Sequence, residues 1–139
     1  MTLDAQDRLD LIDLVVSYAD RIDAGDAEGF AALYAPDAVL ETRSGTANGR
    51  AEVKEWVETL FRERRAGPGT NVKHFISPPH VQGDGDRATL RTQVLIPALG
   101  NSGQIVINIA ATYRDECVKL DGRWYFAKRK IDIEFTSDS

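Results

Sequence analysis

The stretch that decides the fold is Lys119-Leu-Asp-Gly-Arg-Trp-Tyr-Phe-Ala-Lys-Arg129. Its Asp121-Gly122 pair is a typical tight turn, and it joins two segments whose side chains alternate with a period of two, as in a β-hairpin. Read outward from this turn, the same alternation predicts strands at about 38 to 43, 71 to 82, 86 to 97, 104 to 119 and 123 to 135. The links between the later strands are short turn sequences, so we expect antiparallel pairing.

Before residue 71 the hydrophobic period changes to 3.6, which is typical of amphipathic helices. The first helix is expected from Ala5 to about Ala24, with apolar stripes formed by Leu11, Val15, Tyr18 and Ile22 and by Ile12, Val16 and Ala19. A short helix capped by Asp26 carries Phe30, Leu33 and Tyr34, and a third helix after Gly49 carries Val53, Trp56, Val57, Leu60 and Phe61. Three helices followed by a hairpin-linked sheet predict one α+β domain over residues 1 to 139, with the helices on one face of the sheet.

Composition excludes several classes of function. The chain has 22 acidic and 17 basic residues and a formal charge of −5, and its basic residues form no stripe, which argues against nucleic-acid binding. No apolar stretch approaches the length of a membrane span, and the first residues lack the pattern of a signal peptide. The single cysteine, Cys117, cannot form an internal disulfide, so we expect a soluble cytoplasmic protein.

One histidine stands where an apolar side chain is expected. In the run Asn71-Val-Lys-His-Phe-Ile-Ser77, strand alternation puts His74 on the same face as Val72 and Ile76. A histidine on such a face is often only a hydrogen-bonded core residue, but a titratable ring in an apolar interior requires a partner. His80 follows Pro78-Pro79 and is expected to be exposed.

Other polar residues also interrupt apolar patterns. They are Asp23 and Tyr18 in the first helix, Thr92 and Tyr113 on inward strand faces, and Arg129 between Ala127 and Ile131. Each has a structural explanation when taken alone, such as an anchored helix end or a core ion pair. Their convergence on the face covered by helices instead favours a small-molecule site.

The combination has a chemical use. A carboxylate bound to the Nδ1 side of an imidazole fixes the tautomer and leaves the other nitrogen free to remove a proton. We therefore predict that Asp23 orients His74 as a general base, and that Tyr18, Tyr113 and Arg129 donate hydrogen bonds to an enolate or leaving group. One histidine and one aspartate fall short of the three protein ligands usual for catalytic zinc, so no metal is expected.

Five segments carry a resemblance to a known family. They are Leu14-Val-Val-Ser-Tyr-Ala-Asp-Arg-Ile-Asp-Ala-Gly-Asp26, Phe30-Ala-Ala-Leu-Tyr-Ala-Pro-Asp-Ala38, Gly49-Arg-Ala-Glu-Val53, Lys73-His-Phe75 and the stretch from Lys119 to Arg129. The chain resembles the SnoaL-like branch of the nuclear transport factor 2-like superfamily, with a cystatin-like fold. The resemblance implies a cone-shaped domain in which three N-terminal helices pack on a strongly curved, mostly antiparallel sheet.

The resemblance also implies roles for residues. Asp23 and His74 fall on an Asp-His pair shared by scytalone dehydratase, bile-acid dehydratases and hexachlorocyclohexane dehydrochlorinase. Tyr18 falls on a tyrosine of the bile-acid dehydratases, and Arg129 falls on an arginine of the dehydrochlorinase. Thr92 and Tyr113 depart from the histidine and asparagine of scytalone dehydratase, and Tyr18 departs from a lysine of the dehydrochlorinase. These enzymes work without a cofactor.

The implied function is a dehydratase-type lyase or isomerase acting on a polyketide-, aromatic-, terpenoid- or steroid-like molecule. The expected apolar pocket is lined by Tyr34, Trp56, Phe61, Leu90, Val94 and Ile109 together with Thr92 and Tyr113. A polyketide-type cyclase or epoxide hydrolase using the same pocket is an alternative, and a ligand-binding or assembly module, such as a dioxygenase small subunit, is another. We also expect a homodimer, because the strand from Ile105 to Ala111 is apolar on both faces.

Overall fold

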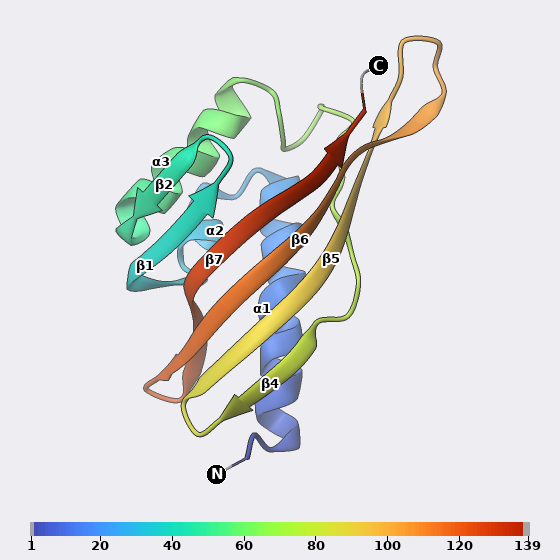
Figure 1. Ribbon diagram of the computed structural model, residues 1–139. Coiled ribbons are helices and arrows are strands. Elements are labelled where there is room, and N and C mark those ends of the chain that lie inside the picture. The colour runs from blue at the N-terminus through green and yellow to red at the C-terminus, as the bar shows by residue number, and fades with distance from the viewer. Residues whose placement is uncertain (1, 138–139) are drawn as a thin grey trace.

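The computed structural model describes residues 2–137 and confirms the α+β prediction. The helices are α1 (Ala5–Ala24), α2 (Ala27–Ala31) and α3 (Gly49–Arg62). The strands are β1 (Tyr34–Thr42), β2 (Gly45–Asn48), β3 (Phe75–Ile76), β4 (His80–Asp84), β5 (Arg87–Leu99), β6 (Ile105–Leu120) and β7 (Arg123–Thr136). They form one sheet in the order β2-β1-β7-β6-β5-β3, with β4 also paired to β5. Figure 1 shows the curved sheet with α1 behind its long strands.

The long antiparallel strands β5, β6 and β7 form the centre of the sheet. Only the pair formed by β1 and β7 is parallel. Along β6 the side chains at 111, 113, 115 and 117 are buried while those at 114 and 116 are exposed, so the odd-numbered residues face the helices. The register places Thr92 opposite Tyr113, and Asp115 opposite Arg129. Buried polar residues from three strands are thereby brought to one region of the inner face.

The first helix follows its predicted bounds. Gly25 adopts φ 73 just after the last turn, a left-handed conformation that glycine adopts without strain. The stripe that contains Leu11, Val15, Tyr18 and Ile22 is buried as predicted. The neighbouring stripe is buried only in part: Ala19 is buried, Ile12 is half-buried and Val16 is 48% exposed. A single helix lying on a sheet buries only one side of its surface, and the first stripe occupies that side.

The strand predicted over residues 71 to 82 is wrong as a continuous element. It is divided into β3 and β4, both of which pair with β5. Pro78 and Pro79 lie between the two strands, and proline has no N–H to donate to a ladder. His74 therefore lies in the segment just before β3. The predicted alternation still holds there, since Lys73 and Phe75 are exposed and the His74 side chain is buried.

Two smaller differences concern the segment after α2. Tyr34 was predicted at the end of the short helix, but it begins β1. The helix ends earlier because the chain turns after Ala31 to pair with β7, with Tyr34 opposite Phe126. The short strand β2, which pairs with the end of β1, was not predicted.

The start of α1 is fixed to the sheet through one carboxylate. Asp4 and Asp7 form a capping box. Oδ1 of Asp7 also accepts hydrogen bonds from Lys119 Nζ at 2.9 Å and from Trp124 Nε1 at 3.0 Å. These two donors, the lysine first, lower the pKa of Asp7 from 3.8 to about 2. Asp7 thus joins the helix to the hairpin of β6 and β7.

The lowered pKa makes the contribution of Asp7 to stability depend on pH. As pH falls below about 4, the unfolded chain binds a proton at Asp7 before the folded protein does, so this stabilisation is present above pH 4 and lost toward pH 2. Urea unfolding of the wild type and Asp7→Asn should show a stability difference at pH 7 that shrinks between pH 4 and pH 2. Asp13→Asn, at an exposed position of the same helix, is the control. A difference that is constant across this range would contradict the assignment.

Candidate active site

His74 is held by both carboxylate oxygens of Asp23. The ring Nδ1 lies 2.7 Å from Oδ1, and the backbone N–H of His74 donates to Oδ2 at 3.1 Å. The His74 side chain is 6% exposed and that of Asp23 is 28% exposed. The predicted pairing of these two residues, which are far apart in sequence, is therefore present in the structure. Two contacts to one carboxylate fix both the position of the histidine backbone and the orientation of its ring.

This geometry assigns roles to the two ring nitrogens. A carboxylate only accepts hydrogen bonds, so Nδ1 is the donor in this contact, and in a neutral ring the lone pair is then on Nε2. Asp23 lies in the last turn of α1, where the helix dipole disfavours a negative charge. Its partnership with an imidazole offsets that disadvantage and gives the residue a chemical role at an otherwise unfavourable place.

Tyr18 joins this pair to the interior of the sheet. Its ring lies edge-on to His74, with the centroids 6.4 Å apart, and its other neighbours are Phe30 at 4.9 Å and Tyr113 at 5.2 Å. Tyr18 and Tyr113 also form a hydrogen bond through their side chains. The structure thus brings together His74 and the two tyrosines that the sequence pattern singled out.

The predicted arginine is at the centre of the interior. Arg129 is 0% exposed, and its Cζ atom lies 4.3 Å from the ring centroid of Tyr18 and 4.2 Å from those of Tyr113 and Phe126. Aromatic faces attract a cation, and the attraction is stronger when water is excluded. The guanidinium is therefore enclosed by rings from α1, β6 and β7.

The partner of Arg129 is Asp115, which was not among the predicted site residues. Nε donates to Oδ1 at 2.6 Å and Nη2 donates to Oδ2 at 2.7 Å, and both side chains are 0% exposed. Removing one partner of such a buried pair typically costs about 3–5 kcal/mol. The sequence did contain a signal, because Asp115 continues the inward face of β6 between Tyr113 and Cys117.

The buried tyrosines are poised to donate hydrogen bonds. Burial raises the pKa of Tyr18, although the charge of Arg129 opposes the increase, and burial raises the pKa of Tyr34 and Tyr113 well above 10.0. All three phenols therefore keep their protons at neutral pH. The Tyr34 hydroxyl has no partner among residues 2–137, whereas one proton of the Tyr18 and Tyr113 pair is used between them.

Three buried polar atoms on the inner face of the sheet lack a hydrogen-bond partner among residues 2–137. They are the Tyr34 hydroxyl, Oγ1 of Thr92 and Nη1 of Arg129. An unpartnered buried donor or acceptor costs roughly 1–3 kcal/mol. Their common occurrence on the inner face distinguishes this region from an ordinary apolar core.

The remaining residues predicted to line a pocket are not equally buried. Leu90 and Val94 are buried in the core, whereas Trp56, Phe61 and Ile109 are half-buried and pack against it. Ile109, Ile131 and Ile133 share the inner face with Tyr113 and Arg129 but remain half-buried. We call these three isoleucines the open end of the inner face, because solvent reaches apolar side chains there.

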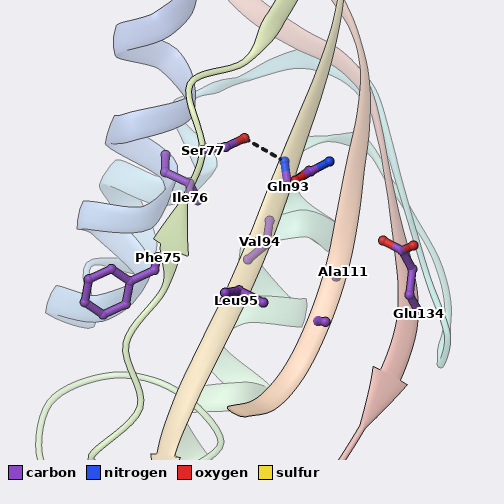
Figure 2. Close-up of a pocket in the computed structure, with 9 residues that line it drawn as sticks. Phe75, Ile76, Ser77, Gln93, Val94, Leu95, Ala111 and Glu134 are labelled. Atoms are coloured by element: carbon purple, nitrogen blue, oxygen red, sulfur yellow. Dashed lines mark hydrogen bonds between the residues drawn. The ribbon is translucent and has the colours of Figure 1, made fainter.

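Hollows on the surface of residues 2–137 include three that are lined by neither His74 nor Asp23. One, of about 440 Å³, lies on the outer side of β5 and β6 and is shown in Figure 2. Phe75 stands beside it, Glu134 lies across from it, and the Ser77 hydroxyl accepts a hydrogen bond from the Gln93 backbone. A second hollow is lined by Arg91, Arg114, Lys128 and Lys130 among others, and a third lies beside α1.

Neither a metal centre nor a membrane helix was found among residues 2–137. No group of three or more His, Cys, Asp or Glu side chains is arranged to hold an ion there. None of the helices in that range combines the length and hydropathy needed to cross a bilayer. His80 is exposed, as predicted.

Comparison with known proteins agrees with the fold and the sequence pattern. The SnoaL-like domain family matches residues 4–130, and no curated protein matches the chain. A protein of unknown function with a cystatin-like fold from Nostoc punctiforme PCC 73102 superposes with a TM-score of 0.84 at 25% identity, covering 96% of each chain. The chain belongs to the SnoaL-like domain family.

Two further solved structures carry the names of enzymes. A proposed scytalone dehydratase from Novosphingobium aromaticivorans DSM 12444 has a TM-score of 0.77 at 23% identity, covering 94% of this chain and 86% of that one. A hexachlorocyclohexane dehydrochlorinase from Novosphingobium barchaimii LL02 has a TM-score of 0.79 at 20% identity, covering 95% and 89%. At these identities the similarity shows a shared fold, the cystatin-like or nuclear transport factor 2-like fold.

Proposed function

We propose that the protein is a cofactor-independent lyase or isomerase of dehydratase type, with His74 as the general base and Asp23 as its orienting partner. The observation that carries this proposal is the double contact between Asp23 and His74, which fixes the ring and directs Nδ1, not Nε2, at the carboxylate. Two solved structures with the same fold are named for elimination reactions, and this supports the choice of reaction class.

The proposed reaction begins with proton transfer to Nε2 of His74 from a carbon next to an activating carbonyl group. The electron pair of the broken C–H bond moves toward the carbonyl and forms an enolate. The neutral phenols of Tyr18 and Tyr113 and the guanidinium of Arg129 stabilise this charge by hydrogen bonding and electrostatics. Loss of a leaving group on the next carbon completes an elimination, and return of the proton to another carbon completes an isomerisation.

The proposed substrate is a small apolar molecule of polyketide, aromatic, terpenoid or steroid type. Aromatic rings and aliphatic side chains enclose His74 and Arg129, and such surroundings favour an apolar skeleton with few polar groups.

The proposed cellular setting is the cytosol. The single cysteine, Cys117, is buried, and burial raises the pKa of its thiol, which makes it unreactive.

Proton abstraction can be tested before the natural substrate is known. A panel of aromatic, terpenoid and steroid ketones in D₂O would be followed by NMR for deuterium incorporation beside the carbonyl. The wild type should accelerate exchange of at least one ketone, and His74→Ala should lower that rate by roughly 10²–10⁴-fold. Asp23→Asn should also lower it, because the ring loses its fixed orientation.

His80→Ala is the matched control, since it removes the other histidine from an exposed position. Its exchange rate should equal that of the wild type, and circular dichroism should confirm that all variants are folded. The proposal fails if no ketone is exchanged, or if both His74→Ala and Asp23→Asn keep near-full rates.

We further propose that the protein is a homodimer formed through the outer face of the sheet. Phe75, Leu95, Ala110 and Phe135 lie opposite one another across four adjacent strands. Phe75 is 63%, Leu95 47% and Phe135 58% exposed, and the hollow in Figure 2 lies beside this row. Ala110 within this row is buried, but three large exposed apolar side chains in one row are typical of a protein interface.

The dimer predicts a solution mass of twice the 15.4 kDa of one chain. Leu95→Glu places a charge at the centre of the row and should give folded monomers in sedimentation velocity experiments. Leu9→Glu, at an exposed site on α1, is the control and should remain dimeric. A monomeric wild type at micromolar concentration would contradict the proposal.

A further inference from the structure

The unpartnered polar atoms of the inner face belong to Arg129 and to two residues near it in the sheet, Tyr34 and Thr92. Tyr34 and Arg129 both contact the ring of Phe126, with a ring-centroid distance of 5.2 Å for Tyr34 and a Cζ distance of 4.2 Å for Arg129. Thr92 lies opposite Tyr113 in the sheet, and Arg129 lies over the Tyr113 ring. The side chains that carry the Tyr34 hydroxyl, Thr92 Oγ1 and Arg129 Nη1 therefore each lie next to the ring of Phe126 or beside Tyr113. We call these three atoms the polar trio.

The polar trio is suited to bind a hydrogen-bond acceptor on a small molecule. Guanidinium N–H groups only donate hydrogen bonds, while the two hydroxyls donate or accept. Nε and Nη2 of Arg129 are already used by Asp115, so Nη1 is the nitrogen that remains for another group. The group that suits each of the three atoms is an oxygen with lone pairs.

Charge narrows the choice further. Asp115 and Arg129 form a neutral pair, and both side chains are 0% exposed. A carboxylate placed beside them would bring a negative charge with no matching cation into a buried interior, which is strongly unfavourable. The enolate of the proposed reaction differs, because its charge forms together with that of the His74 imidazolium. A carbonyl or hydroxyl oxygen brings no net charge and avoids this penalty.

The polar trio lies close to the proposed base. The ring of Tyr18 touches both His74 and the guanidinium of Arg129, so one aromatic side chain separates the two. The trio has almost no contact with solvent. An apolar molecule must therefore part side chains to reach it. The half-buried isoleucines of the open end lie on the same face of the sheet.

We propose that Asp115 determines substrate specificity: by neutralising Arg129, it makes the interior accept a neutral carbonyl or hydroxyl oxygen at the polar trio and reject a carboxylate. This inference rests on the proposed function, since it concerns the same interior. Asp115 acts through Arg129, and the hydroxyls of Tyr34 and Thr92 donate hydrogen bonds to the oxygen of the bound molecule.

Three probes of similar size separate the possible preferences. Acetophenone carries a neutral carbonyl, benzoate carries a carboxylate, and ethylbenzene carries neither. In NMR titrations at pH 7.5, the wild type should bind acetophenone most tightly, ethylbenzene more weakly and benzoate least. Undetectable acetophenone binding, or benzoate binding as tight as that of acetophenone, would overturn the proposal.

Isosteric variants test the polar trio directly. Thr92→Val and Tyr34→Phe each remove one unpartnered oxygen, so each should weaken acetophenone binding by roughly two- to tenfold and leave ethylbenzene binding unchanged. Neither should lower the melting temperature of the protein, because the deleted atom has no partner within the described chain. Thr89→Val, at an exposed position on β5, is the matched control. Unchanged acetophenone binding in both variants would also overturn the proposal.

Asp115→Asn tests the origin of the selectivity. It keeps the size of the side chain but leaves the charge of Arg129 uncompensated, so the ratio of benzoate to acetophenone affinity should rise at least tenfold. An unchanged ratio in a folded variant would contradict the role of Asp115. Should this variant fail to fold, the wild-type order of affinities and the Thr92 and Tyr34 variants decide the question alone.

Binding by His74→Ala separates this proposal from the proposed function. The variant should keep the preference for acetophenone over benzoate, because His74 is not part of the polar trio. If the wild type itself shows no preference for acetophenone over benzoate, the proposed role of Asp115 in specificity is rejected and the assignment of His74 as the base is unaffected. Full proton exchange in His74→Ala would reject the base and leave the specificity intact.

Discussion

The interior of this protein is organised around one buried cation. The guanidinium of Arg129 is completely removed from solvent, and its charge is held by Asp115 and by the faces of three aromatic rings. Such a group is tolerated only where its partners are fixed in advance. The register of β6 against β7 places the carboxylate opposite the arginine, and α1 supplies Tyr18. The helix, two strands and the centre of the sheet thus depend on the same contact.

The Asp23–His74 pair forms a second constraint, in the last turn of α1. Its two hydrogen bonds attach the segment before β3 to the helix, although Pro78 and Pro79 prevent this segment from continuing as one long strand. Tyr18 lies between the two constraints and touches both. One helix therefore positions a carboxylate that orients the His74 ring and an aromatic ring that covers the guanidinium of Arg129.

Sequence patterns predicted much of this arrangement. The change of period from 3.6 to 2 gave the α+β class, and the three long strands were placed within a few residues of their observed bounds. Asp23 and His74 were paired because each interrupts an apolar pattern, and the structure brings them to 2.7 Å. The break between β3 and β4 and the extension of β1 to Tyr34 were missed, since both depend on pairing with distant strands rather than on local pattern. Asp115 was missed although its position on the inward face of β6 is visible, because its significance lies in its cross-strand partner.

The measurement that tests the central claim most directly is the tautomer of His74. Long-range ¹H–¹⁵N correlation spectra of the histidine rings at pH 8 distinguish a protonated nitrogen from a bare one. The account predicts that His74 carries its proton on Nδ1, facing Asp23, and that Nε2 is unprotonated and available as a base. A proton found on Nε2 would contradict it.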